Sequence, residues 1–264
     1  MPGDAVTDNL PLSFHNAGDC RLAFRKRAAR HAQQMKPGIV WLGGFKSDML
    51  STKAAALDHF AAQEGRACLR FDYSGHGESE GRFEEGTIPR WTQESLGMIR
   101  AQTSGPQILV GSSMGGWISL LVARALVAQE ARERLAGLVL IAPAVDFTES
   151  LMWAQMPAAI RKDIETKGVW LRESAYLPEP TPITRALIED GRRNLMFDGA
   201  IEAHAPVHIL QGMQDPDVPW QHAMTLVEHL AGDLVTLSLI KDGDHRLSRD
   251  EDIKALITAV ANIA

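Results

Sequence analysis

The chain has 264 residues, of which 27 are basic and 33 acidic, giving a formal net charge of −6. Hydrophobic residues make up 45% and charged residues 23%, which excludes a disordered chain and allows a large buried core. The acidic balance without a long basic run argues against nucleic acid as a partner, and the longest apolar stretch, residues 135–145, is too short to span a membrane.

Short apolar runs alternate with amphipathic segments along the first half of the chain. The run at residues 38–43 carries no charge, which indicates a strand buried on both faces. The helix predicted at residues 52–64 ends at Gly65, a typical residue for the position after a helix. The other predicted strands cover 12–15, 21–26, 67–73, 107–111 and 138–142, and the other predicted helices 89–101 and 117–128.

The alternation breaks between residues 147 and 205, which contain amphipathic helical pieces but no clear buried strand. It resumes with predicted strands at 207–210 and 235–240, a helix at 220–231 between them, and a last helix that begins with a capping box of Ser248 and Glu251. Alternating strands and helices predict a mostly parallel sheet with helices on both faces. Residues 1–146 and 206–264 are therefore expected to form one α/β core, and residues 147–205 an inserted cap.

The segment Gly111-Ser112-Ser113-Met114-Gly115 fits the pattern G-x-S-x-G and lies between a predicted strand and a predicted helix. This context is that of a nucleophile elbow, a sharp turn that lifts a serine hydroxyl above the sheet edge. Ser113 is the candidate nucleophile, because Ser112 would need a glycine two positions later, where Met114 stands. The alternative is an inert serine in a glycine-rich turn.

A serine nucleophile needs a base and an orienting acid, which follow the serine in the order acid, then histidine, on this kind of fold. Asp215 lies just after the predicted strand at 207–210 and is favoured as the acid. Asp217 is the less favoured alternative, since it suits a turn or the start of the next helix.

The candidate base is His245, in the loop between the last strand and the last helix. His222 and His229 fall inside a predicted helix, and we expect them to be ordinary surface or interface residues. His76 precedes the serine in the chain, so we expect it to support the site structurally. The pattern implies no metal and no organic cofactor.

Two backbone N–H groups are needed to bind the developing oxyanion. We expect them from Met114, which follows the nucleophile, and from Phe45 in the glycine-rich loop after residues 38–43; a plain turn is the alternative there. Large apolar residues of the cap could line an acyl pocket or could only attach the cap to the core, namely Met152, Trp153 and Met156.

Five segments together resemble the serine α/β-hydrolases: FDYSGHGES, GPQILVGSSMGGW, KGVW, QGMQDPDVPW and DGDHRLS. They are most similar to the acyl-protein thioesterase and acyl-glucuronide esterase branch, over about residues 10–264. The resemblance implies an eight-stranded sheet with a helical cap, and places nucleophile, acid and base on Ser113, Asp215 and His245. The chain has Gln211-Gly212 where many relatives have His-Gly, a difference not expected to affect the chemistry.

The leading hypothesis is therefore a serine esterase or thioesterase that acts on acyl substrates through an acyl-enzyme intermediate. The alternatives are a peptidase or amidase with the same triad, and a non-catalytic binding protein on the same fold. The two cysteines form no CxxC pair, and the N-terminus has neither an apolar leader nor an Arg-rich transit pattern. A bacterial-type cytoplasmic enzyme, with no nucleic-acid or membrane partner, is expected.

Overall fold

The computed structural model describes residues 10–30, 36–173, 179–232 and 234–263. Residues 1–9, for which the sequence predicts no leader, lie outside this part of the chain. No helix within the described ranges is long and apolar enough to cross a membrane.

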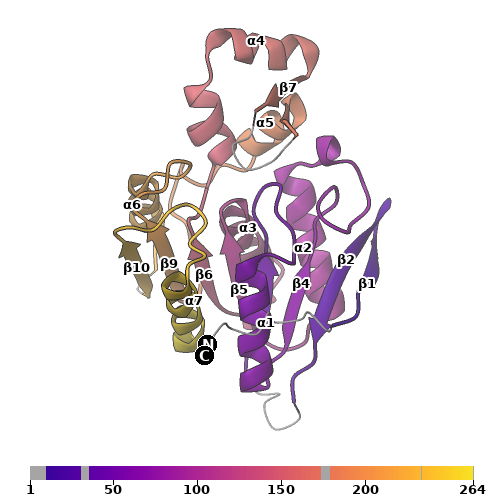
Figure 1. The fold of residues 1–264 in the computed structure, drawn as a ribbon, viewed down its shortest axis with the longest axis vertical. Coiled ribbons are helices and arrows are strands. Elements are labelled where there is room, and N and C mark those ends of the chain that lie inside the picture. Colours follow the sequence, from indigo (N-terminus) through magenta and orange to yellow (C-terminus); the bar gives the residue numbers. More distant parts are fainter. Residues whose placement is uncertain (1–9, 31–35, 174–178, 233, 264) are drawn as a thin grey trace.

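Eight strands form one sheet in the order β1-β2-β4-β3-β5-β6-β9-β10 (Figure 1). Strand β2 pairs antiparallel with β1 and β4, and the other pairings are parallel. The predicted eight-stranded, mostly parallel sheet is confirmed. The strands are β1 (Ser13–Ala17), β2 (Cys20–Arg27), β3 (Gly38–Leu42), β4 (Cys68–Phe71), β5 (Gln107–Ser112), β6 (Leu135–Ile141), β9 (Val207–Gly212) and β10 (Val235–Ile240).

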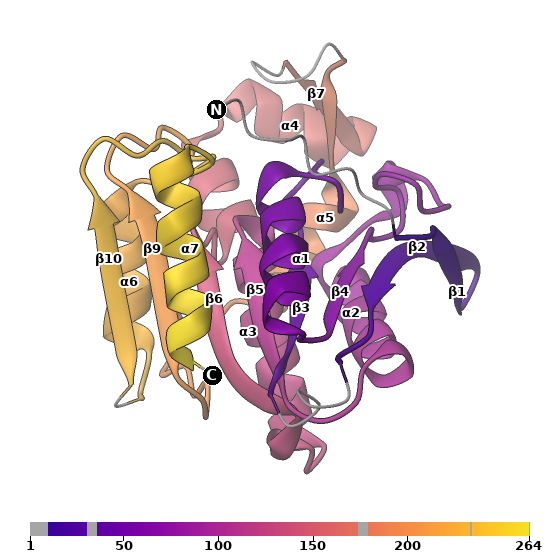
Figure 2. The same ribbon diagram turned by 60° about the horizontal axis from the view of Figure 1, so that its bottom comes forward.

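Helices cover both faces of this sheet, because the side chains of its central strands alternate between two apolar layers. In β3, Ile39 and Trp41 face one buried cluster, whereas Val40 and Leu42 face the other. Figure 2 shows α1 and α7 in front of the sheet, with α2, α3 and α6 behind it. The bounds are α1 (Thr52–Glu64), α2 (Ile88–Gln102), α3 (Met114–Ala128), α6 (Trp220–His229) and α7 (Asp250–Ile263).

The start of α7 differs from the prediction, and the capping box of Ser248 and Glu251 is wrong. The helix begins at Asp250, and the carboxylate of Asp252 accepts a hydrogen bond from the backbone N–H of Arg249 at 3.1 Å. The Ser248 hydroxyl donates instead to a carbonyl of the preceding loop. The acid that accepts a hydrogen bond at the start of the helix is therefore Asp252, one residue after the predicted Glu251, and its donor is Arg249, one residue after the predicted Ser248.

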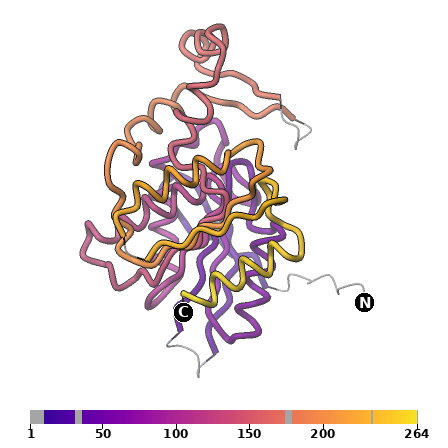
Figure 3. The backbone as a smooth tube through the Cα atoms, turned by 90° about the vertical axis from the view of Figure 1, so that its left-hand side faces the viewer, coloured from indigo at the N-terminus to yellow at the C-terminus, as the bar shows by residue number. Residues whose placement is uncertain are grey.

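The segment between β6 and β9 projects from one end of the sheet as a separate lobe (Figures 1 and 3). The expectation that it holds no clear buried strand is wrong, because β7 and β8 pair antiparallel and Thr181, Pro182 and Ile183 of β8 are buried. Strand β8 has only four residues and includes a proline, which hides it from a periodicity search. The lobe contains one π-helical turn (Thr148–Met152), one 3₁₀ turn (Trp153–Gln155), α4 (Ala158–Lys167), β7 (Val169–Arg172), β8 (Thr181–Thr184) and α5 (Arg185–Arg192).

The two ends of this segment are tied together at its base. Asp146 is buried, and its carboxylate accepts hydrogen bonds from the backbone N–H groups of Met196 and Phe197 at 2.9 Å. The Phe197 ring packs in turn against His222 and His229 of α6, with ring centroids 5.1 and 5.0 Å apart. These contacts fix the lobe to the helix that follows β9.

The turn between β5 and α3 is packed too closely for side chains. A Cβ atom on Gly111 would overlap the carbonyl oxygen of Gly115 and the hydroxyl of Ser119. A Cβ atom on Gly115 would overlap the carbonyl oxygen of Leu42 at the end of β3. Strand, helix and the neighbouring loop can meet here only because both positions are glycine.

We therefore expect Gly111→Ala to lower the free energy of unfolding by about 2–3 kcal/mol, because backbone must move to admit the methyl group. Gly97→Ala in α2 is the matched control: nothing lies within 4 Å of its added Cβ, so a gain of about 0.5–1 kcal/mol is expected. Urea denaturation of both variants provides the measurement, and equal effects would contradict the packing argument.

Candidate active site

Ser113 stands in the turn between β5 and α3 with φ 54° and ψ −117°, a conformation that residues other than glycine rarely adopt. Its N–H donates to the carbonyl of Ile141 at 2.8 Å, and its own carbonyl accepts from the N–H groups of Gly116 and Ala144. Helix α3 starts at Met114, directly after the serine and three residues earlier than predicted. The surrounding bonds hold the serine in this strained conformation.

The loop after β3 lies against the nucleophile turn. A Cβ atom added to Gly44 would stand 3.4 Å from the Cβ atom of Ser113. The backbone N–H groups of Phe45 and Met114 donate to no protein acceptor among the residues that the structure describes. The two groups expected to bind an oxyanion are therefore free to do so.

Side chains from the loop after β4 hold the loop after β3 in place. His76 Nε2 accepts a hydrogen bond from the N–H of Lys46 at 3.2 Å. The carboxylate of Asp72 accepts from the N–H of Met49 at 2.7 Å. Because His76 Nδ1 lies 3.2 Å from the carbonyl oxygen of Ser74, the proton of a neutral ring belongs on Nδ1.

The surroundings of His76 keep its imidazole neutral. The ring is buried among Tyr73, Phe83 and Trp91, with centroids 5.1 to 5.6 Å apart. Burial lowers the pKa of His76 to about 4, and the nearby Lys46 charge acts in the same direction. His76 therefore serves as a hydrogen-bond acceptor for the loop, in keeping with the structural role expected from the sequence.

Asp215 and His245 meet at the ends of β9 and β10. The Asp215 side chain is fully buried, and its Oδ2 lies 2.8 Å from His245 Nδ1. Its Oδ1 accepts from the backbone N–H groups of Asp217 and Val218, both at 2.8 Å, and Gln211 Nε2 lies 3.3 Å from Oδ2. Every oxygen of the buried carboxylate thus has donors, which is the condition for burying a charge.

Backbone contacts between the turn after β9 and the turn after β10 bring Asp215 and His245 together. The N–H of Gln214 donates to the carbonyl of Gly243 at 2.9 Å, and the N–H of Met213 donates to Ile240 at 2.9 Å. A Cβ atom on Gly212 would overlap the carbonyl oxygen of Gly243. The absence of a side chain at Gly212 lets the loop that carries His245 lie directly on the turn that carries the acid.

The three apolar cap residues named from the sequence occupy different surroundings. Met156 is buried inside an apolar cluster of the lobe, whereas Met152 adjoins both this cluster and the main core. Trp153 is half-buried, and the guanidinium groups of Arg161 and Arg192 lie over its ring at 5.7 and 4.6 Å. Of the three, Met152 is the one that borders both the lobe and the core.

A metal ion has one set of possible ligands in the described part of the chain. Asp215, Asp217 and His245 each offer an atom, and these atoms lie within 4.8 Å of one another. A cation bound to His245 Nδ1 would have to displace the proton shared with Asp215, because a nitrogen cannot hold both. Both oxygens of Asp215 already have hydrogen-bond donors from the protein.

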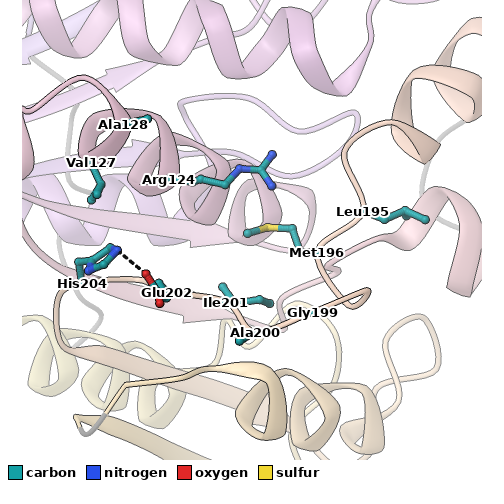
Figure 4. Close-up of a pocket in the computed structure, with 10 residues that line it drawn as sticks. All are labelled: Arg124, Val127, Ala128, Leu195, Met196, Gly199, Ala200, Ile201, Glu202 and His204. Carbon is teal, nitrogen blue, oxygen red and sulfur yellow. Dashed lines mark ion pairs between the residues drawn. The ribbon is translucent and has the colours of Figure 1, made fainter.

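A cavity of about 490 Å³ lies away from these residues, between the end of α3 and the segment 195–204 (Figure 4). It contains the exposed Arg124 and an ion pair between His204 and Glu202 at 3.1 Å. None of Ser113, Asp215 and His245 lines it. Its other lining residues are Val127, Ala128, Leu195, Met196, Gly199, Ala200 and Ile201.

Sequence reasoning missed Lys53 and named Gln211 without assigning it a role; both are polar residues next to the site. Gln211 lies beside the Asp215 carboxylate, and Lys53 is a buried lysine at the start of α1. One signal was present: Lys53 stands four residues before Leu57, on the buried side of its helix. A lysine on an apolar stripe indicates a polar partner elsewhere in the fold.

Comparisons with known proteins agree with this architecture. The model of the alpha/beta hydrolase family matches residues 38–259. The human palmitoyl-protein thioesterase ABHD10, mitochondrial, is 35% identical over 98% of this chain and 82% of its own. A crystal structure from Agrobacterium vitis S4 is 46% identical with a TM-score of 0.91, over 96% and 99% of the two chains. The mouse alpha/beta hydrolase domain-containing protein 10 is 33% identical with a TM-score of 0.83, over 96% and 98%.

The neutral His76 predicts a specific pH dependence of stability. An unfolded histidine takes up a proton near pH 6.5, whereas folded His76 does so only near pH 4. Stability therefore falls as the pH drops through this range, by about 3 kcal/mol relative to His76→Gln, which can accept the same bond without titrating. Burial raises the pKa of Asp72 to about 6, so protonation of Asp72 increases stability as the pH falls. This effect is the same in wild type and in His76→Gln, and it cancels when the two proteins are compared. Denaturation curves that shift equally with pH would contradict the prediction.

Proposed function

This chain belongs to the α/β hydrolase family and is an ester or thioester hydrolase, and we propose that Ser113, Asp215 and His245 form its catalytic triad. The observation that carries this proposal is the 2.8 Å contact of His245 Nδ1 with the buried carboxylate of Asp215. Ser113, at the carboxyl end of β5, supplies the nucleophile at the same edge of the sheet. The order along the chain is serine, acid, histidine, as this fold requires.

The proposed reaction starts with His245 in the neutral form that carries its proton on Nδ1. The Asp215 carboxylate accepts that proton's hydrogen bond and leaves Nε2 as the base. Nε2 takes the hydroxyl proton of Ser113 as its oxygen attacks the acyl carbonyl. His245 then protonates the departing alcohol or thiol, and a water molecule, activated by the same nitrogen, releases the acid from the serine.

Negative charge forms on the substrate oxygen during both halves of the reaction. The N–H groups of Met114 and Phe45 are proposed to bind this oxygen, because both lack an acceptor in the described part of the protein. Met114 is also the first residue of α3, so the helix dipole adds to the stabilisation. Such preorganised donors each contribute about 3 kcal/mol to catalysis in comparable sites.

We propose that residues 147–205 act as a cap and that the acyl chain lies between the cap and the core. Two half-buried residues border both parts: Phe45, whose backbone N–H is a proposed oxyanion donor, and Met152. The name of the human relative, a palmitoyl-protein thioesterase, supports a long acyl chain as substrate. Met156 is buried and joins the elements of the cap to one another. Trp153 is half-buried, so its exposed part is available to contact the acyl chain.

A cytoplasmic location is part of the proposal, because Cys20 and Cys68 are both buried and unpaired, as expected in a reducing compartment. The human relative is named as mitochondrial, and that location is also compatible with free thiols. The chemistry at Ser113 does not involve either cysteine.

The hydrolase assignment is tested by comparing wild type with Ser113→Ala on short-chain and long-chain acyl thioesters, carboxyl esters and amides. We expect the wild type to cleave thioesters and esters, and Ser113→Ala to lose about 10⁴–10⁶ in kcat. A fluorophosphonate should label wild type at Ser113 and leave the variant unlabelled. Amides cleaved faster than esters would overturn the proposed bond class, and an active Ser113→Ala would overturn the nucleophile.

The identity of the acid gives a second prediction. Asp215→Asn replaces an oxygen that orients His245, so we expect kcat to fall by about 10⁴ as the wrong imidazole tautomer is favoured. Asp217→Asn is the matched control, because the backbone N–H that Asp217 donates to Asp215 is kept in this variant. The measurement is the steady-state kcat of the two variants. A greater loss of kcat in Asp217→Asn than in Asp215→Asn would reverse the assignment.

A further inference from the structure

We propose that Lys53 is a positioning residue that holds the loop carrying His245 in its working conformation. The proposal rests on the triad proposed above, and extends it to a residue on a different element. Lys53 is the second residue of α1 and is only 8% exposed.

The ammonium group of Lys53 reaches the backbone next to the base. Its Nζ donates a hydrogen bond to the carbonyl oxygen of Arg246, the residue that follows His245. The hydroxyl of Ser248 donates to the same oxygen at 2.9 Å. One helix on the face of the sheet thereby holds a loop that is 193 residues further along the chain.

The other side of this loop is held by its own aspartate. Oδ1 of Asp244 accepts from the backbone N–H groups of Arg246 and Leu247, at 3.0 and 2.9 Å. Asp215 fixes the His245 ring at Nδ1. With the ring held by Asp215, the backbone after His245 depends on Asp244 and Lys53, and its placement decides where Nε2 points.

Burying an ammonium group to bind a carbonyl oxygen costs folding free energy. Burial above all, together with the Arg246 charge, lowers the pKa of Lys53 to about 8, against the opposing effect of the Asp244 and Asp252 charges. In the described ranges Lys53 makes no ion pair, and the nearby Asp252 of α7 pairs with Arg249. An apolar side chain of similar size would fold at lower cost, so the lysine indicates a functional requirement.

The test compares kcat, KM and thermal stability of Lys53→Met with wild type on an acyl thioester. We expect kcat to fall about 10-fold to 100-fold, as for small misplacements of a catalytic group, with KM within about twofold. The melting temperature should stay equal or rise, because a buried charge is removed. A purely structural role predicts the reverse pattern, in which activity is lost only in proportion to stability.

The pH profile and a conservative variant provide the second readout. Wild-type kcat should decline as the pH rises through about 8, where the ammonium loses its proton and its stronger, charge-assisted bond. Lys53→Arg keeps a cation and a donor, so it should regain most of the rate and lack this decline. Lys53→Arg also tests the proposal should Lys53→Met fail to fold, because a kcat of Lys53→Arg that still declines through about pH 8 would contradict it.

Lys254→Met is the matched control, since Lys254 is exposed on α7 and should leave rates unchanged. The rate of Ser113 labelling by a fluorophosphonate separates the two proposals. A wild type that is not labelled overturns the triad. A labelled wild type with Lys53→Met labelled at the same rate overturns the role of Lys53 and leaves the triad intact.

Discussion

The close contact between the turn after β5 and the end of β3 is the constraint on which the site depends. Gly111 and Gly115 bring strand, helix and neighbouring loop together without room for a Cβ atom. That approach puts Gly44, the residue before Phe45, beside Ser113. It also keeps Ser113 at a positive φ that it would not adopt alone.

Four aspartates organise the loops at this edge in the same way; three are buried and Asp244 is exposed. Each carboxylate accepts hydrogen bonds from two backbone N–H groups: Asp72 after β4, Asp146 at the base of the lobe, Asp215 after β9 and Asp244 next to His245. A carboxylate can satisfy two donors of irregular backbone that no strand or helix would pair. The loops gain fixed shapes without secondary structure.

Two polar residues near the proposed reaction centre fix the position of a loop at a cost in folding free energy. His76 is neutral because it is buried, and so accepts a hydrogen bond from the loop after β3. Lys53 is buried beside the loop that carries His245, without a carboxylate partner in the described chain. Both features cost folding free energy. The apolar contacts of Phe45 with Phe83, Trp91 and Phe147 offset part of that cost while forming the boundary with the lobe.

The alternation of strands and helices, the family and the triad candidates could be predicted from the sequence. Periodicity and glycine spacing are local features, and the order of Ser113, Asp215 and His245 can be read along the chain. The sequence did not reveal the β7–β8 pair, the start of α7, or the roles of Gln211 and Lys53. These features were visible in the folded structure alone, for two physical reasons. The contact of Lys53 with Arg246 joins segments 193 residues apart, and such a contact leaves no periodic trace in the sequence. The β7–β8 pair and the contacts of Asp252 with Arg249 and of Gln211 with Asp215 are local, but four-residue strands and single polar contacts are too short for a periodic pattern to reveal.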